Sequence, residues 1–425
     1  IAAGLIAVVP TAYDVAANAY VDLTFALYVT LAMHAAARWW TTLEATRLAY
    51  LALAVGFALS VKLITVFVVF PLLLVVLLRA HETEGGRHGA EPAAGRLALA
   101  GLAALAIGAA LGSPWYLRTW VWTGSPLFPF YVNLWPASGA GWDAERSVLY
   151  QQFLFAFGGE RRLLEYLAAP VRLSLFAQPE EAALYDGVLG ISFLAGAVLV
   201  GWALWRRALD RELGIAAGAA AVYGLFWLAS SQQLRFLLPA LPAFALAIAG
   251  STARRRVLAW ILLATTLMGS LVTVAWFAGE RPLRAVLGGE SRADYLRRRL
   301  DYYPYYELIH RETPPTARVW LVNMRRDTYH LDRPHVSDYI FEDYTLRKHL
   351  DAARDVGDLR ERARAARITH LLVRHDILLD PARSPVVDDR RTPAQNAEKL
   401  SLLRAFLQSG RVMRHDARFV LVELH

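Results

Sequence analysis

Long apolar runs recur through the first two thirds of the chain and are separated by short polar connections. Runs of this length predict helices that cross a lipid bilayer, whose hydrocarbon core is about 30 Å thick. The run from Leu48 to Leu78 is too long for one span, and we divide it at Ser60–Lys62. The pattern predicts an α-helical polytopic membrane domain over residues 1–278. Its expected spans are 1–10 (partial), 15–37, 46–60, 62–79, 97–112, 188–205, 213–229, 236–250 and 257–278.

The pattern changes in residues 279–425, where short strands alternate with helices. The stretches RVWLVN, THLLVR and FVLVEL are rich in Val and Leu and predict strands. The stretches LRERARAA and AQNAEKLSLLRAFLQSG predict helices, and a glycine cap is expected to end the second. This alternation predicts a small soluble α/β domain. We find no glycine fingerprint, P-loop or His/Glu metal spacing in its sequence.

Composition supports this division into two domains. Residues 279–425 contain 27 of the 45 Lys and Arg residues and 22 of the 37 Asp and Glu residues. The net charge of +8 comes from scattered basic residues that flank apolar runs, which argues against a nucleic-acid partner. The absence of Cys excludes disulfides and thiolate metal sites. The chain opens inside an apolar run without a signal-peptide pattern, and we expect a further N-terminal portion before Ile1.

Basic residues in the connections predict the orientation of the spans, because they collect on the cytoplasmic side. The other side holds only Lys62 and Arg235, so that side is expected to face outward together with the 113–187 segment and the C-terminal domain. This predicts a multi-pass protein of the bacterial cytoplasmic (inner) membrane with an extracytoplasmic C-terminal domain. The residues assigned to the cytoplasmic side are Arg38, Arg47, Arg79, Arg87, Arg96, Arg206, Arg207, Arg211, Arg254, Arg255 and Arg256.

The 75-residue segment 113–187 is more than a connection. It begins with SPWYLRTWVWTGSPLFPFYVNLWP, and its later stretches YQQFLFAFGG and EYLAAPVRLSLF predict short amphipathic helices in the membrane interface. A simpler interpretation of Trp115, Trp120 and Trp122 is an aromatic belt that anchors the end of a helix.

Asp14, Asn18 and Asp22 have the spacing i, i+4 and i+8, which predicts one helix face about 12 Å long. Asp22 would then lie more than two turns inside an apolar span, where a carboxylate costs roughly 2.5–3.5 kcal/mol and usually faces a cavity or a partner. A structural role stays open for both acids. Thr11 and Asp14 resemble a capping box, and Asp22 could be a hydrogen-bonded packing residue, although its expected position excludes a cap.

Three cations are predicted on the same membrane face as the two acids. Lys62 either extends to the interface or meets an anionic headgroup or phosphate near the surface. Arg118 and Arg235, each taken alone, are typical of interface anchors. Anchoring at the interface does not explain well why two acids and three cations are grouped below the 113–187 segment.

In four stretches that hold most of these residues, the sequence resembles the GT-C superfamily of glycosyltransferases that use polyprenyl-phosphate sugars. It is most similar to the bacterial branch that includes protein mannosyltransferases and lipid A aminoarabinose transferases. The resemblance covers most of residues 1–278 and rests on AYVDLTFALYVTLAMHAA, GFALSVKLITVF, SPWYLRTWVWTGSPLFPF and QQLRFLLPALPAFALA.

The resemblance implies an inverting hexosyl- or pentosyltransferase with a GT-C-like membrane domain. In that family an acidic residue in the first outward loop is taken as the base, and we expect that loop to precede Ile1. Asp22 matches a second acidic position, which shapes the site or holds a divalent metal, and Lys62 and Arg235 match ligands of the donor phosphate. No cofactor is required by this chemistry. The candidate catalytic residues are Asp22 and Asp14, and the candidate substrate-binding residues are Lys62, Arg118, Arg235, Asn18, Trp115 and Tyr116.

The expected partners are the lipid bilayer, a polyprenyl-phosphate sugar donor and an acceptor in the cell envelope. Two other classes stay open. A transporter or flippase for lipid-linked sugars usually shows internal repeats, and none is evident between residues 1–112 and 188–278. A structural or sensory protein whose C-terminal domain binds a partner is the third possibility.

Overall fold

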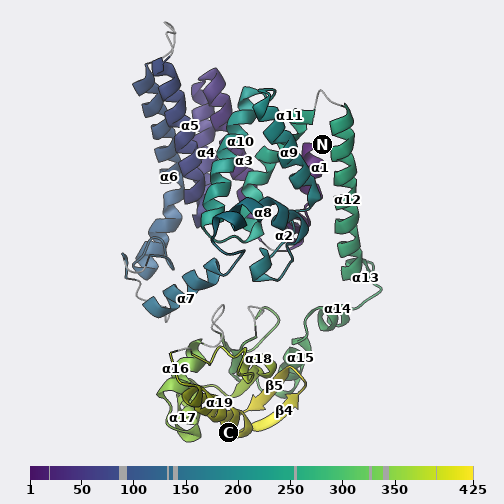
Figure 1. Ribbon diagram of the computed structural model, residues 1–425. Coiled ribbons are helices and arrows are strands. Elements are labelled where there is room, and N and C mark those ends of the chain that lie inside the picture. The colour runs from purple at the N-terminus through teal and green to yellow at the C-terminus, as the bar shows by residue number, and fades with distance from the viewer. Residues whose placement is uncertain are drawn as a thin grey trace. The chain divides into compact units, whose positions relative to one another are not determined.

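A computed structural model of the chain shows two compact units, Ile1–Glu280 and Arg281–His425 (Figure 1). The predicted cytoplasmic residues Arg87, Arg254 and Arg255 lie outside the described residues, as do short parts of the 113–187 segment. The structure describes residues 1–18, 20–85, 93–131, 134–136, 142–252, 256–324, 328–337, 344–388 and 390–424.

Unit Ile1–Glu280 is a bundle of helices, with α7 and α8 lying at one end of it and crossing the direction of the others (Figure 1). Its elements are α1 (Ala2–Ala7), α2 (Pro10–Ala17), α3 (Asp22–Thr42), α4 (Ala45–Val61), the 3-10 helix η1 (Leu63–Thr65), α5 (Val66–Gly85), α6 (Ala94–Thr123), α7 (Ala144–Phe155), α8 (Leu163–Leu175), η2 (Ala182–Leu184), α9 (Ile191–Trp205), α10 (Arg211–Ala229), η3 (Leu234–Ala240), α11 (Leu241–Thr252) and α12 (Arg256–Glu280).

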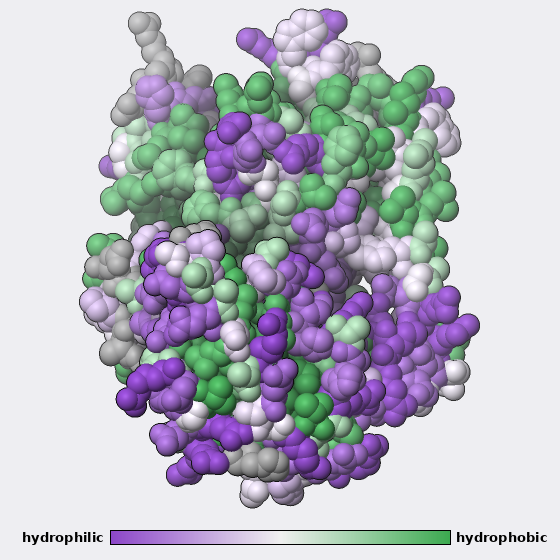
Figure 2. All heavy atoms as spheres, turned by 60° about the horizontal axis from the view of Figure 1, so that its bottom comes forward, coloured by the Kyte–Doolittle hydropathy of each residue, from purple (hydrophilic) through white to green (hydrophobic). Residues whose placement is uncertain are grey.

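Within the described residues, five helical stretches are long and apolar enough to cross a membrane, and α2 with α3 would make a sixth if the bent pair were one span. Large apolar side chains such as Phe70, Ile107 and Leu271 are exposed on these helices, and much of the unit's surface is hydrophobic in Figure 2. Such a surface is typical of helices that face lipid. The five stretches are Leu63–Thr83, Ala94–Thr123, Arg211–Ala229, Leu234–Thr252 and Arg256–Glu280.

The predicted span at 15–37 is wrong at its start. The helix does not run through Asn18, because α2 ends at Ala17 and α3 begins at Asp22, with a bend of 118° between them. Asp14, Asn18 and Asp22 therefore do not share one helix face. Thr11 is not an N-cap either: α2 begins at Pro10, a residue favoured in the first turn because it lacks an N–H.

Helix α6 is longer than predicted and carries the first part of the 113–187 segment. It runs through Pro114 and ends at Thr123, where Gly124 adopts the left-handed conformation typical of a helix end. The two amphipathic helices predicted further along this segment are present as α7 and α8. The predicted division at Ser60–Lys62 is confirmed, since α4 ends at Val61 and Lys62 has extended backbone.

Glycines allow α4 and α6 to pack closely. A Cβ atom on Gly108 would lie 2.8 Å from the carbonyl oxygen of Ala52, and one on Gly112 would lie 2.5 Å from the Cβ of Leu59. Gly56 of α4 faces them, with its oxygen 3.2 Å from the added Cβ of Gly112. Small residues four apart are the usual means by which membrane helices approach one another. The apolar pattern of the sequence did not reveal this contact.

Connections predicted to share the cytoplasmic side lie together in the structure. Arg38 Nη1 donates to Glu212 Oε1 at 2.8 Å, which ties the end of α3 to the start of α10. Arg79 Nε donates to the carbonyl oxygen of Trp40 at 3.0 Å, which ties α5 to the same end of α3. The ends of α3, α5 and α10 that carry Arg38, Arg79 and Arg211 therefore lie together.

Unit Arg281–His425 contains a five-stranded sheet with the strand order β2-β1-β3-β5-β4. The first three strands are parallel, whereas β5 is antiparallel to both β3 and β4. The predicted stretches form β1, β3 and β5, and two strands were missed because β2 is only three residues long and β4 is a mostly exposed edge. The strands are β1 (Val319–Val322), β2 (His335–Ser337), β3 (His370–Arg374), β4 (Arg411–His415) and β5 (Phe419–Glu423).

Both faces of this sheet are buried, because successive side chains of each strand point to opposite faces. In β3, Leu371 and Val373 join the core under α16, α17 and α19, while Leu372 joins the core under α15. The helices of the unit are α13 (Pro282–Val286), α14 (Arg292–Arg299), α15 (Tyr303–Glu312), α16 (Tyr344–Ala352), α17 (Val356–Ala365), α18 (His375–Leu378) and α19 (Pro393–Gln408).

The glycine cap predicted for α19 is wrong. Its C-cap is Ser409, with a φ angle of −76°. Gly410 serves a different purpose, since a Cβ there would lie 2.5 Å from the carbonyl oxygen of Glu423. This glycine permits close approach of two backbones rather than a left-handed turn.

Candidate functional site at three helix breaks

Three charged residues of unit Ile1–Glu280 lie at three interruptions of its helices. Asp22 is the first residue of α3, after the bend that separates α3 from α2. Lys62 stands between α4 and η1, and Arg235 lies in the 3-10 helix η3 that precedes α11. Backbone groups freed at such breaks need polar surroundings inside a membrane, so these positions can tolerate charge where a continuous apolar helix cannot.

Asp22 and Lys62 form an ion pair in which the Lys62 ammonium donates to Asp22 Oδ1. The Asp22 side chain is 2% exposed and the Lys62 side chain is 22% exposed, so the carboxylate is buried and the lysine is only partly so. Asp22 also lies in the first turn of α3, where the helix dipole favours a negative charge. The prediction that Asp22 lies two turns inside a span is therefore wrong, although its burial beside a partner is confirmed.

The Phe236 ring lies next to two cations. Lys62 Nζ is 4.2 Å from the ring centroid, and the Arg235 guanidinium carbon is 5.2 Å from it. The guanidinium also lies 4.8 Å from the centroid of the Tyr20 ring. Arg235 Nε is buried and has no hydrogen-bond partner among the described residues. Two cations beside one ring repel one another, so an anion next to Phe236 would be attracted by both.

Asp14 lies on α2, the helix before the bend, and is half-buried. Asn18 Nδ2 donates to Asp14 Oδ1 at 2.9 Å, so the last residue before the bend orients this carboxylate. Arg235 attracts Asp14, whereas Asp186 repels it. The structure thus brings Asp14, Asn18, Asp22, Lys62 and Arg235 together, although not through the single helix face that the spacing predicted.

Two polar residues near this group, Gln233 and Asp186, were not among the candidates predicted from the sequence. Gln233 Nε2 donates to Asp186 Oδ2, and this contact ties η3 to the connection that precedes α9. Trp227 Nε1 donates to the carbonyl oxygen of Gln233 at 2.9 Å and holds the same segment against α10. Gln233 is part of SSQQLRF, where two adjacent amides before an apolar run were an available signal.

The aromatic candidates on α6 are arranged differently. The Arg118 guanidinium stacks 4.0 Å from the ring centroid of Trp122 and 5.7 Å from that of Trp115, all on the same exposed helix surface. Tyr116 points the other way, and its hydroxyl donates to the carbonyl oxygen of Leu59 at 3.1 Å. Tyr116 therefore supports the end of α4 near Lys62, while Arg118 and Trp115 have the arrangement of an interface anchor.

A divalent metal at Asp22 does not fit the residues around it. The Asp22 carboxylate already accepts from an ammonium, which is itself a cation. Across the described part of the chain, no group of three or more His, Cys, Asp or Glu residues is placed to hold a metal ion. We therefore assign no catalytic step to a metal at Asp22.

The fold and the site define a class: a polytopic helical protein with paired charges at the breaks of its helices. Comparison of the sequence with models of known protein families and with curated proteins finds no match. Chemically, the site can bind an anion between Lys62 and Arg235 and can accept a proton at a carboxylate next to it.

Proposed function

We propose that the chain is a membrane glycosyltransferase that transfers a sugar from a polyprenyl phosphate to a cell-envelope acceptor. The observation that carries this proposal is the placement of Lys62 and Arg235 against one ring, Phe236, at breaks next to membrane-length helices. A lipid-linked donor needs its phosphate held near the membrane surface and its tail in lipid. A site at the ends of long apolar helices meets both requirements.

In this proposal Lys62 and Arg235 bind the phosphate of the donor. The bond between the anomeric carbon and the phosphate oxygen breaks, and the phosphate leaves with the electron pair. Cations placed where this negative charge develops lower the barrier. Asp22 keeps the Lys62 ammonium charged and fixed in position, and this is why Asp22 need not touch the substrate.

The acceptor hydroxyl attacks the anomeric carbon and must lose its proton. The resemblance expects the main base before Ile1, and Asp14 is the candidate for this role within the chain. Its side chain accepts a hydrogen bond only from the Asn18 amide among the described residues, so it is available to take that proton. The attack proceeds from the face opposite the phosphate and inverts the anomeric configuration. The proposed reaction takes place on the outer face of the bacterial cytoplasmic membrane, because the arginine-rich connections lie at the other end of the helices.

Transfer is tested with the purified full-length protein in lipid nanodiscs, supplied with radiolabelled polyprenyl-phosphate hexoses and pentoses and a membrane extract as acceptor. We expect label to move to the acceptor and free polyprenyl phosphate to appear in equal amount. Arg235→Gln should lower kcat/KM by roughly 100-fold, since it removes a charge-assisted contact to the leaving group.

Arg162→Gln is the matched control, because that side chain is 78% exposed and pairs with Glu160 at the surface. It should transfer at the wild-type rate. The proposal is wrong if no donor of either class is consumed, or if Arg235→Gln transfers as well as Arg162→Gln does.

A transporter or flippase for the same lipid is the second candidate, favoured by the 118° break between α2 and α3. Broken helices that point charged groups at a substrate are common in transporters. Liposomes separate the two functions. Movement of labelled lipid across the membrane without a covalent product would support transport, whereas label in the acceptor supports transfer.

A further inference from the structure

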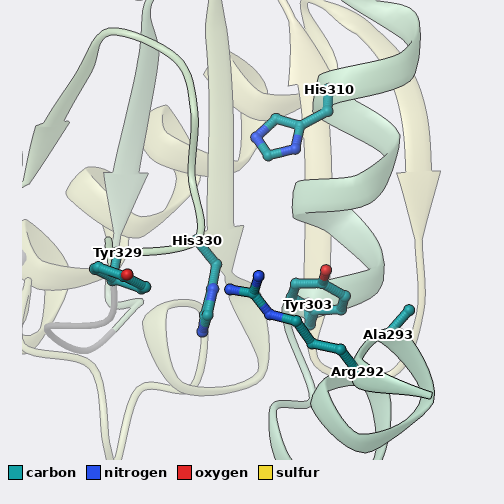
Figure 3. Close-up of a pocket in the computed structure, with 6 residues that line it drawn as sticks. All are labelled: Arg292, Ala293, Tyr303, His310, Tyr329 and His330. Carbon is teal, nitrogen blue, oxygen red and sulfur yellow. The ribbon is translucent and has the colours of Figure 1, made fainter.

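Unit Arg281–His425 contains a second candidate site, built from residues that have no part in the proposed transfer. It is an open cavity of about 460 Å³ between α14, α15 and the loop after β1. This volume is within the usual range for a small-molecule site. Figure 3 shows the lining, which consists of Arg292, Ala293, Tyr303, His310, Tyr329 and His330.

Hydrogen-bond donors predominate in this lining. The backbone N–H of Asp332 donates to His310 Nε2 at 2.7 Å, so this nitrogen is the acceptor and His310 Nδ1 carries the proton. Arg333 donates to the carbonyl oxygen of His310 at 2.8 Å and fixes this end of α15. A histidine with one nitrogen held by the backbone presents a donor in a fixed direction.

Arg292 brings the permanent charge of the cavity. Its guanidinium points toward the ring of His330 (Figure 3), and it makes no ion pair or hydrogen bond with the residues that the structure describes. Its neighbours on α14 are different, since Arg297 pairs with Glu307 and Arg298 pairs with Glu290. The described lining contains no carboxylate. A guanidinium that has no carboxylate partner in the described lining favours a carboxylate or a phosphate as its ligand.

The rings of the cavity stand at right angles. Tyr303 and His330 meet at 89° with their centroids 5.7 Å apart, and Tyr329 and His330 meet at 81° with centroids 5.1 Å apart. A flat nucleobase stacks best between parallel rings, and neither of these two contacting ring pairs is parallel. A puckered sugar ring can place its weakly positive C–H groups on the negative face of one tyrosine while its hydroxyls meet the edges of the other rings.

We propose that this cavity binds an anionic saccharide, with the acid group on Arg292 and His310 and the sugar ring against Tyr303 and Tyr329. The acid group is a carboxylate, as in a uronate, or a phosphate on a sugar hydroxyl. The site does not depend on glycosyl transfer, so the two proposals can fail separately.

Binding is measured by calorimetry on the full chain in nanodiscs with glucuronate, glucose 6-phosphate, glucose and AMP. Glucuronate or glucose 6-phosphate should bind at least 10-fold more tightly than glucose. Tighter binding of glucuronate would identify the acid group as a carboxylate, and tighter binding of glucose 6-phosphate would identify it as a phosphate. Arg292→Gln should weaken that binding by about 10- to 100-fold, the range expected for a charge-assisted contact. Tyr329→Ala should weaken it about 3- to 10-fold without a risk to folding, because Tyr329 is 87% exposed.

Arg311→Gln is the matched control on α15, since its side chain is 71% exposed and pairs with Glu312. It should bind as the wild type does. Equal affinity for glucose and for both anionic sugars would overturn the proposal, as would full affinity in Arg292→Gln. Tighter binding of AMP than of either anionic sugar would overturn the saccharide part of it.

Discussion

Variants of the Asp22–Lys62 ion pair can separate what the pair contributes to stability from what it contributes to catalysis. Asp22→Asn leaves the Lys62 ammonium without its partner, and Lys62→Met leaves a carboxylate that is 2% exposed without any cation bound to it. The double variant removes both charges and leaves an amide and a thioether of similar size in their place.

Removing one partner of a buried ion pair costs about 3–5 kcal/mol, mainly because the other charge stays buried and unpaired. The Lys62 side chain keeps 22% of its surface in contact with solvent, so the lower end of this range applies. We expect each single variant to lose about 3 kcal/mol in the free energy of unfolding. The double variant should lie within about 1 kcal/mol of the wild type, because replacing a buried pair as a whole is often nearly neutral.

Unfolding is followed by circular dichroism in mixed micelles with increasing denaturing detergent, and transfer activity is measured on the same samples. Stability should return in the double variant, whereas activity should stay low, since the phosphate has lost one of its two cations. Additive losses from the two single variants would show that the charges are not coupled in the folded protein. Full activity in the stable double variant would show that the pair serves only the fold.

Three further predictions concern other parts of the chain. Gly108→Leu should lower the free energy of unfolding by about 2 kcal/mol, because the larger side chain forces α4 away from α6. Gly218→Leu is the control: an added Cβ there meets no atom within 4 Å, so the same unfolding assay should show little change. Thr392→Ala should lower the stability of the C-terminal unit by about 1 kcal/mol, seen as faster hydrogen exchange in α19, because it removes a capping box. Burial lowers the pKa of His370 below its usual value near 6.5, so the unfolded chain takes up a proton before the folded chain as the pH falls. The protection factors of the β3 amides, which correct for the pH dependence of the exchange reaction itself, should be constant above pH 6.5 and fall below it, and His370→Gln should reduce that fall.

Much of the helical unit could be predicted from its apolar runs. The division of the Leu48–Leu78 run was visible because Lys62 is the one charge within it, and the structure breaks the helix there. The grouping of the arginine-rich connections followed from the charge pattern in the same way. In both cases a polar residue marked the place where the regular structure changes.

The bend before Asp22 could not be predicted in this way. Tyr20 and Val21 continue the apolar pattern across the break, so the residues between Asn18 and Asp22 look like part of one helix. The contact found at the new helix start is tertiary: Lys62, from another helix break, binds the Asp22 carboxylate, and no local pattern reveals this. Glycine contacts such as that of Gly108 were missed for a related reason, because an apolar pattern does not show how closely two helices approach.

The helix breaks and the charges explain each other. An unpaired Asp22 within an apolar helix would be costly, but at the first turn of α3 it gains both the helix dipole and an ammonium. Lys62 and Arg235 in turn lie where η1 and η3 replace regular α-helix, and both contact Phe236; Asp22 pairs with Lys62, whereas no ion pair of Arg235 is found among the described residues. Stability alone does not favour such an arrangement, because replacing the Asp22–Lys62 pair as a whole by uncharged side chains is often nearly neutral. A bound anion relieves the repulsion, and this is the physical reason to look for a phosphate there.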